Sequence, residues 1–256
     1  MIPGRLWLLA LLALLPIDAG KAQGVWNPEY DGICGLGSQS ETGCADIRAR
    51  RIVDAAERPW RAIGRVNFAG SDTRMHCTGV LVSDRLVLTA AHCLYDHARK
   101  RWVSAVSVQF VAGYQRGEVA ATSSVRRYRL DPQQGLDGRF QPDPALDWAV
   151  LELTQPLGET VGFLPPTAPG EAGFLAGYSG LRPHVLSVTG ECPVRPDTEG
   201  LLRGFCPVMR GDSGAPLLTG STERPGVAAI LSRIASSAKG VSGLFLPVAL
   251  FDLNEE

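Results

Sequence analysis

The apolar residues of this chain come in short runs, and this pattern limits the folds that the chain can adopt. The runs are four to ten residues long and are bounded by Gly, Pro, Asp or Ser: residues 62–68, 77–82, 86–90, 102–111, 148–153, 185–188, 215–218, 227–231 and 244–248. Short apolar or alternating runs between turn-forming residues are typical of β-strands. The 29 glycines and 18 prolines suit the many turns that such strands need. We therefore predict an all-β protein.

The balance of charges argues against a nucleic-acid partner. The 256 residues include 25 Lys and Arg against 26 Asp and Glu, which gives a formal net charge of −1. Binding to a phosphate backbone depends on an excess of basic side chains. With 45% hydrophobic residues, the chain has enough apolar material for packed cores in one large domain or two small ones. We expect a folded protein that binds no nucleic acid.

The first 22 residues have the layout of a secretory signal peptide. Arg5 precedes an apolar run over residues 6–15, and the small residues Gly20 and Ala22 follow it. This run is much shorter than the roughly 20 apolar residues that a membrane-spanning helix needs. We predict that residues 1–22 are removed and that the mature protein is secreted or periplasmic and not bound to a membrane.

An even number of cysteines in an exported chain favours disulfides over free thiols. The six are Cys34, Cys44, Cys77, Cys93, Cys192 and Cys206. Six cysteines allow fifteen pairings. No C-x2-C pair is present, and a metal site built from residues 76, 77, 92 and 93 would have unusual spacing. We expect neither a metal nor another cofactor.

A candidate nucleophile is Ser213 in the sequence GDSGAP, residues 211–216. The flanking glycines allow a sharp turn that leaves the hydroxyl exposed. A serine hydroxyl is a poor nucleophile unless a base takes its proton and a third group orients that base. All four histidines precede Ser213, which excludes the Ser, Asp, His order of α/β-hydrolases.

His92 and Asp147 are the best candidates for the base and its orienting group. His92 ends an apolar strand and is next to Cys93, whose covalent bond would fix its position. An orienting carboxylate is expected to be buried, and Asp147 leads directly into the apolar sequence WAVLEL. Asp137 and Asp143 are nearby alternatives, but both lie in turn-like sequence that predicts solvated side chains.

Taken in order, TAAHC at residues 89–93, DWAVL at 147–151 and GDSGAP at 211–216 resemble the motifs of the chymotrypsin-like (trypsin family) serine endopeptidases. The sequence RIVDAAE at residues 51–57 resembles the activation junction of that family. The resemblance covers about residues 51–251. It implies two packed six-stranded antiparallel β-barrels with the site between them.

The resemblance also implies a division of the chain. The signal peptide (1–22) is followed by a propeptide (23–51) and a protease domain (52–256). The N-terminal barrel would cover about 52–160 and the C-terminal barrel about 161–256. The Pro- and Gly-rich stretch at residues 156–173 is the best candidate for the internal boundary.

The resemblance assigns catalytic roles to these residues. Ser213 would attack the peptide carbonyl, His92 would act as general base and then general acid, and Asp147 would hold the tautomer of the histidine. The backbone N–H groups of Gly211 and Ser213 would form the oxyanion hole. The implied substrate is a polypeptide.

The resemblance further implies a zymogen that is cleaved after Arg51. The α-ammonium of Ile52 would then be buried against the carboxylate of Asp212, and an activating protease would be a partner. Burying either charge alone is unfavourable, so the substrate pocket and the oxyanion hole would form only when both charges are present. The alternative is that residues 48–51 are only a solvated basic turn.

Disulfide pairings also follow from the resemblance. Cys77 and Cys93 correspond to the disulfide of the histidine loop, and Cys192 would pair with Cys206 near the nucleophile. Cys34 and Cys44 are left to pair with each other.

The specificity pocket departs from that of trypsin. Pro207 stands six residues before the nucleophile, where a preference for Arg or Lys requires an acid. With Val208 and Met209 beside it, the sequence favours a small or apolar side chain at P1, the substrate residue before the cleaved bond.

The strand that includes Ser232 is expected to pair with the substrate backbone. Ile234 stands where the family prefers glycine, which would narrow the pocket. Gly243 is expected to keep the opposite wall open.

One alternative function is a protease-like binding protein that keeps the fold without turnover. Such proteins commonly lose a member of the active site, whereas this chain retains His92, Asp147, Ser213 and Gly211. Nothing in the sequence indicates oligomerisation, and a monomer is expected.

Overall fold

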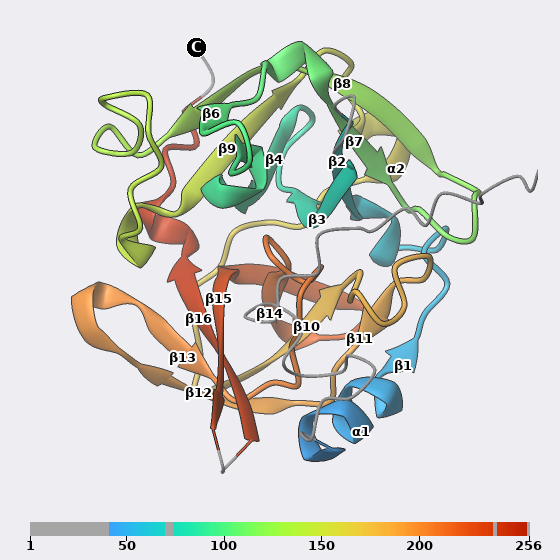
Figure 1. Ribbon diagram of the computed structural model, residues 1–256. Helices are drawn as coiled ribbons and strands as arrows, with labels where there is room; N and C mark the ends of the chain where they lie inside the picture. Colours follow the sequence, from blue (N-terminus) through green and yellow to red (C-terminus); the bar gives the residue numbers. More distant parts are fainter. Residues whose placement is uncertain (1–40, 70–73, 238–239, 255–256) are drawn as a thin grey trace, which may run out of the picture.

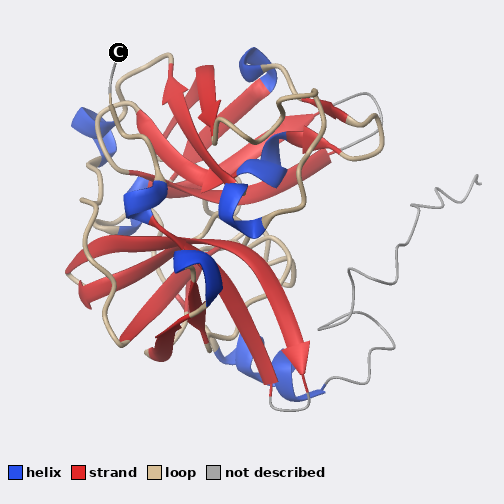
Figure 2. Ribbon diagram, turned by 90° about the vertical axis from the view of Figure 1, so that its left-hand side faces the viewer, coloured by secondary structure: helices blue, strands red, loops and turns tan. Residues whose placement is uncertain are grey.

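The computed structural model describes residues 41–69, 74–237 and 240–254 (Figure 1). The predicted signal peptide and residues 23–40 of the predicted propeptide lie outside the described residues. Strands form two groups, one above the other, and the few helices are short (Figure 2). The prediction of an all-β fold with two barrels is confirmed.

The first barrel is closed and antiparallel, with its strands in the order β2-β3-β4-β9-β8-β7. Their bounds are β2 (Ile63–Ala69), β3 (Arg74–Leu81), β4 (Leu86–Ala90), β7 (Val108–Ala112), β8 (Ala121–Leu130) and β9 (Trp148–Leu153). Alternation places one set of side chains inside, as in β7, where Val108, Phe110 and Ala112 are buried. Every residue of β4 is buried, because its outer face also lies against the rest of the molecule.

The second barrel is a ring of six strands in the order β10-β12-β13-β16-β15-β14, closed by pairing of β14 with β10. Their bounds are β10 (Ala172–Gly177), β12 (Cys192–Pro196), β13 (Leu202–Gly204), β14 (Pro216–Ser221), β15 (Arg224–Ser237) and β16 (Gly240–Pro247). Two short strands, β1 (Arg51–Ile52) and β11 (Ser187–Val188), extend the sheet beyond β10. The predicted cleavage junction, between Arg51 and Ile52, is therefore part of this sheet.

The remaining elements are short. They are α1 (Glu41–Ala49), α2 (Gly158–Val161), β5 (Tyr95–Asp96), β6 (Arg101–Trp102) and the 3-10 helices η1 (Trp60–Ala62), η2 (Ala91–Leu94), η3 (Ala105–Ser107), η4 (Pro144–Leu146), η5 (Thr198–Gly200) and η6 (Val248–Leu250). In Figure 1, α1 lies at the lower edge of the second barrel. Within the described ranges, no helix has the length and apolar character needed to cross a membrane.

The two barrels are held together at several points. A large apolar cluster contains residues of both, including Leu88 of the first barrel and Leu218 of the second. The connection between β9 and β10 bonds to both barrels, since the N–H of Leu164 donates to the carbonyl of Leu81 and that of Thr167 to the carbonyl of Val227. These contacts fix the relative position of groups that the two barrels bring to a shared site.

Two disulfides join described cysteines, Cys77 with Cys93 and Cys192 with Cys206. The first links β3 to η2 and so restrains the segment that carries His92. Cys44 is also disulfide-bonded. Cys34, its expected partner, lies outside the described residues.

Candidate active site

His92 and Asp147 lie together because the strands next to them are paired. His92 is in η2, directly after β4, and Asp147 directly precedes β9. Strands β4 and β9 are antiparallel, with Ala90 opposite Trp148. One oxygen of the Asp147 carboxylate (Oδ1) accepts the backbone N–H of His92 at 2.8 Å, and the other (Oδ2) is 2.8 Å from its ring Nδ1. The imidazole is thus held in one orientation.

Ser232 makes a third hydrogen bond to this carboxylate. Its hydroxyl donates to Oδ2 of Asp147 at 2.6 Å, and both residues are buried. Ser232 lies at an irregularity of β15, where the register with β16 shifts between Leu231 and Arg233. Backbone pairing of this strand with substrate stays a prediction, and the contact of the Ser232 hydroxyl with Asp147 is a further role that was not predicted.

These contacts change the proton affinity of His92. Burial of the imidazole lowers its pKa, but the charge of the Asp147 carboxylate and its hydrogen bond to the ring raise it by more. The pKa of His92 therefore lies above its ordinary value of 6.5. A base of this kind is stabilised in the protonated form that follows proton abstraction.

Ser213 lies in a tight loop that packs against the first barrel. Gly211 (φ 93°) and Gly214 (φ 78°) have left-handed backbone conformations that favour glycine. The carbonyl of Ser213 accepts the N–H of Thr78 in β3 at 2.8 Å. Within the described part of the chain, no hydrogen bond joins the Ser213 hydroxyl to His92. Such bonds are often long in free enzymes and tighten with substrate.

The loop presents two unused N–H groups. The carbonyl of Arg210 accepts the N–H of Gly180 at 2.6 Å, and in a trans peptide this turns the N–H of Gly211 to the opposite side. Neither Gly211 nor Ser213 donates its N–H to an acceptor among residues 41–69, 74–237 and 240–254, whereas Asp212 donates to the carbonyl of Met209. Two neighbouring free donors are what an oxyanion hole requires.

Thr78 ties the barrels together at this loop. Its hydroxyl donates to the carbonyl of Gly211 at 3.0 Å and accepts the N–H of Tyr178 at 3.0 Å. Its own carbonyl accepts the hydroxyl of Thr89 at 2.9 Å. Thr78 was not among the residues predicted for the site, because no motif contains it.

Asp212 is fully buried and pairs with an arginine. Its Oδ2 atom is 2.7 Å from the guanidinium of Arg50 and also accepts the N–H of Met209 at 3.0 Å. The predicted partner, the α-ammonium of Ile52, exists only after cleavage, and in this uncleaved chain Ile52 lies in β1 with 42% of its surface exposed. The cation at Asp212 is a side chain two residues earlier.

The expected pocket residues lie along β15, β16 and the loop before Ser213. Ile234 is directly opposite Gly243 and packs against the core of the second barrel. A Cβ on Gly243 would lie 2.6 Å from side-chain atoms of Leu231 and Phe245. The space beside Gly243 is therefore occupied by these two core side chains. Pro207 is half-buried next to the buried Val208.

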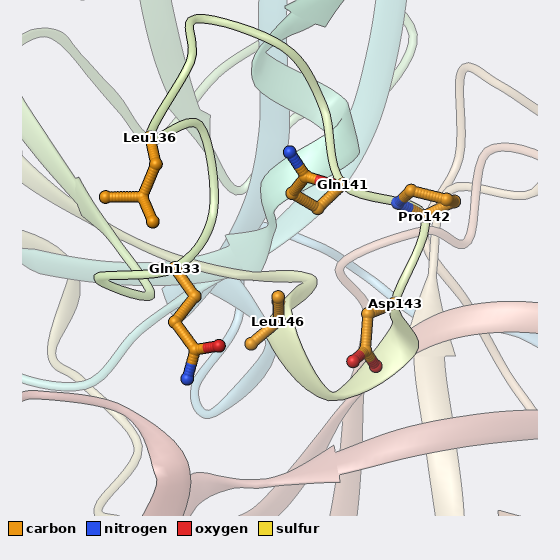
Figure 3. Close-up of a pocket in the computed structure, with 6 residues that line it drawn as sticks. All are labelled: Gln133, Leu136, Gln141, Pro142, Asp143 and Leu146. Carbon is orange, nitrogen blue, oxygen red and sulfur yellow. The ribbon is translucent and has the colours of Figure 1, made fainter.

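A hollow lies beside β15. It is lined by residues between β8 and β9, namely Gln133, Leu136, Gln141, Pro142, Asp143 and Leu146 (Figure 3). The guanidinium of Arg233 donates to the carbonyl of Pro142, which ties this loop to the strand position after Ser232. Leu136 is 79% exposed and offers an apolar surface here.

The two alternative carboxylates stabilise this same loop. Asp143 accepts the N–H of Ala145 and caps η4, and Asp137 accepts the N–H of Arg139. Neither contacts His92 in the part of the chain that the structure describes.

The ring of His92 lies close to the sulfur atoms of Cys77 and Cys93. These two sulfurs are bonded to each other. Because metal ions bind the thiolate, a disulfide provides no such ligand.

Comparisons with known proteins identify a family to which this chain is similar. Residues 50–180 match the family model described as Trypsin. The match includes His92 and Asp147 and ends before Ser213. The glutamyl endopeptidase of Bacillus licheniformis is 25% identical over 183 residues, which cover 68% of this chain and 54% of the relative.

Human serine protease 23 is 32% identical over 161 residues, covering 54% of this chain and 42% of the relative. This chain thus spans about half the length of the curated relatives that it matches.

Solved structures show the same fold. A Glu endopeptidase in complex with MPD has a TM-score of 0.63 at 20% identity and covers 78% of this chain and 92% of that chain. The protease Anisep from Arthrobacter nicotinovorans has a TM-score of 0.61 at 20% identity, covering 75% and 91%.

Proposed function

Because this chain belongs to the trypsin family, we propose that it is a serine endopeptidase that uses Ser213, His92 and Asp147. The observation that supports the proposal most is that Asp147 forms hydrogen bonds with both the backbone N–H and the ring Nδ1 of His92. With the ring proton on Nδ1, directed at Asp147, the other nitrogen, Nε2, is the basic one. It is free to take the proton of Ser213.

In the proposed reaction, Oγ of Ser213 forms a bond to the carbonyl carbon of the substrate while its proton moves to Nε2 of His92. The resulting oxyanion accepts hydrogen bonds from the backbone N–H groups of Gly211 and Ser213. One such donor contributes roughly 3–4 kcal/mol to lowering the barrier. His92 then gives this proton to the leaving amine as the C–N bond breaks, which leaves an acyl-enzyme. Water, with its proton taken by His92, attacks the acyl carbon, the bond to Oγ of Ser213 breaks, and His92 returns the proton to Ser213.

We propose that the substrate side chain at P1 is small or apolar. Pro207, Val208 and Ile234 support this, because they are apolar and lie on elements next to the nucleophile loop. An acidic P1 side chain would need a cation in the pocket. The nearby Arg233 is engaged with the carbonyl of Pro142 instead.

We also propose that the protein is exported and matured by cleavage after Arg51. The signal-like residues 1–22 and the disulfides support an oxidising compartment outside the cytoplasm. Cleavage would create an α-ammonium on Ile52, which lies opposite Ser187. The carbonyl of Ser187 contacts the same guanidinium as Asp212, so this new charge would form close to Asp212.

Profiling of a peptide library tests the proposal. The purified chain is incubated with the library before and after cleavage at Arg51, and products are identified by mass spectrometry. We expect hydrolysis after small or apolar residues, its loss in Ser213→Ala, and its retention in the control Ser107→Ala, whose hydroxyl donates to the carbonyl of Ser104 just before η3. Binding of peptides without any hydrolysis would support a protease-like binding protein instead.

A further inference from the structure

A buried ion pair joins the segment before the predicted cleavage site to the nucleophile loop. Arg50 and Asp212 are 162 residues apart in sequence, and both side chains are completely inaccessible to solvent. A buried charge is strongly unfavourable without an opposite charge and hydrogen bonds. The buried charge of each residue is therefore stabilised by the charge of the other.

The backbone around Arg50 directs this side chain inward. Its carbonyl accepts the guanidinium of Arg182 at 3.2 Å, and the next two residues pair with β11. Its own guanidinium also donates to the carbonyls of Gly177 (3.3 Å) and Ser187 (2.8 Å). The neighbouring Arg48 and Arg51 are exposed. Only one member of this basic run thus reaches Asp212.

Asp212 organises the loop that would bind the oxyanion. It lies between Gly211 and Ser213, the two residues with free N–H groups. Its side chain accepts the N–H of Met209, and its carbonyl accepts that of Ala215 at 2.7 Å. A group that fixes the carboxylate of Asp212 therefore fixes the direction of both N–H groups.

We propose that Arg50 is a positioning residue that supplies the cation opposite Asp212 in the uncleaved chain, so that the oxyanion loop is formed and active before cleavage. This inference rests on the proposed function. Arg50 takes the place that the α-ammonium of Ile52 would take after cleavage, and cleavage exchanges one cation for another.

The state of the loop favours this role over an inhibitory lock. A lock would hold Asp212 where the oxyanion donors are turned away or engaged inside the protein. Here the bond from Gly180 to the carbonyl of Arg210 turns the Gly211 N–H away from Gly180, and this N–H has no acceptor among the described residues. Strand β1 is also already paired with β11, so the segment around the cleavage site is in place without cleavage.

The test uses an Arg51→Gln chain, which cannot be cleaved at the junction, with its length checked by intact mass. The measurement is the rate of labelling by a fluorophosphonate, which reacts with an activated serine. We expect this chain to label within about tenfold of the chain cleaved after Arg51. Adding Arg50→Gln should lower the rate about a hundredfold or more, which is the effect of losing one oxyanion donor. Adding Arg48→Gln, in the same basic run, should leave it unchanged.

Rescue separates positioning from folding. In the Arg51→Gln chain, Arg50→Lys should label faster than Arg50→Gln, because lysine restores a cation opposite Asp212. In an Arg50→Ala chain, millimolar guanidinium chloride should raise the rate, whereas sodium chloride at the same ionic strength should not. A loss of labelling that neither Arg50→Lys nor guanidinium relieves would show a packing role only and would overturn the inference.

The same measurements distinguish the inference from the proposed function. If the cleaved chain reacts with the fluorophosphonate and the Arg51→Gln chain does not, the proposed endopeptidase function is supported and the proposed role of Arg50 is wrong. Equal labelling of Arg50→Gln and Arg48→Gln would also overturn it. If neither the cleaved nor the uncleaved chain labels, the proposed function itself is wrong.

Discussion

The carboxylate of Asp147 holds His92 at two points, since Oδ1 accepts the backbone N–H of His92 and Oδ2 binds its imidazole Nδ1, each at 2.8 Å. Two contacts to one rigid group leave the ring little freedom to rotate. The orientation of the base is therefore built into the protein before any substrate arrives.

Replacing Asp147 with Asn should lower kcat by about four orders of magnitude, because an amide no longer favours the tautomer with the proton on Nδ1. KM should change little, since Asp147 is buried away from solvent and substrate. Steady-state kinetics on a peptide substrate measures both constants. A decrease of less than about tenfold in kcat would contradict the role of Asp147.

The pH profile of kcat/KM should report His92. The reaction needs the neutral imidazole, so activity is lost as the pH falls through the pKa of this group. Because Asp147 raises that pKa, the midpoint of the acid limb should lie above 6.5. In the Asp147→Asn chain the midpoint should move to lower pH. A wild-type midpoint at or below 6.5 would be inconsistent with the observed pairing.

Replacing Ser232 with Ala should destabilise the protein by about 1.5–3 kcal/mol, the usual range for a hydrogen bond to a charged group. The lost bond is the 2.6 Å contact from the hydroxyl to Asp147. Urea unfolding at neutral pH measures the free energy of unfolding. Ser104→Ala, at an exposed position before η3 where the side chain makes no capping hydrogen bond, is the control and should change it by about 0.5 kcal/mol or less. Equal effects of the two substitutions would contradict this.

Replacing Thr78 with Val should slow fluorophosphonate labelling and destabilise the fold by about 1–3 kcal/mol, because the N–H of Tyr178 and the carbonyl of Gly211 each lose a hydrogen bond. Thr122→Val removes a hydroxyl that bonds to the carbonyl of Phe110 far from this loop. That control should affect stability but not labelling. Unchanged labelling in Thr78→Val would mean that Thr78 does not support the oxyanion loop.

Sequence patterns predicted the strands whose side chains alternate or are wholly apolar. The runs at residues 86–90 and 148–153 have the same bounds as β4 and β9. Strand β8 was missed because its sequence ATSSVRRYRL is mostly polar and much of it is only half-buried. The single strand predicted at residues 102–111 is instead β6, η3 and β7.

Glycines inside a strand concealed the start of β10. The stretch 156–173, interpreted as the internal boundary, lies mostly in the connection between β9 and β10 and includes the first two residues of β10. Gly173 and Gly177 lie in that strand where a side chain would collide with Leu218 and with Asp212, respectively. The helix α1 was not predicted at all. Close packing between distant segments, which creates these requirements, leaves no local pattern in the sequence.

The same distinction holds at the site. His92, Asp147 and Ser213 stand in short motifs that can be recognised locally. Arg50 and Thr78 bind partners at least 100 residues away, so the sequence around each of them does not show its role.

The most direct test of the central claim is to map the site of a fluorophosphonate adduct by mass spectrometry in the wild-type chain and in His92→Ala. We predict one adduct per chain, located on Ser213, with a rate that falls by at least about a thousandfold in His92→Ala because the hydroxyl loses its base. No adduct in the wild type, an adduct on a different serine, or labelling of Ser213 that does not depend on His92 would contradict the account.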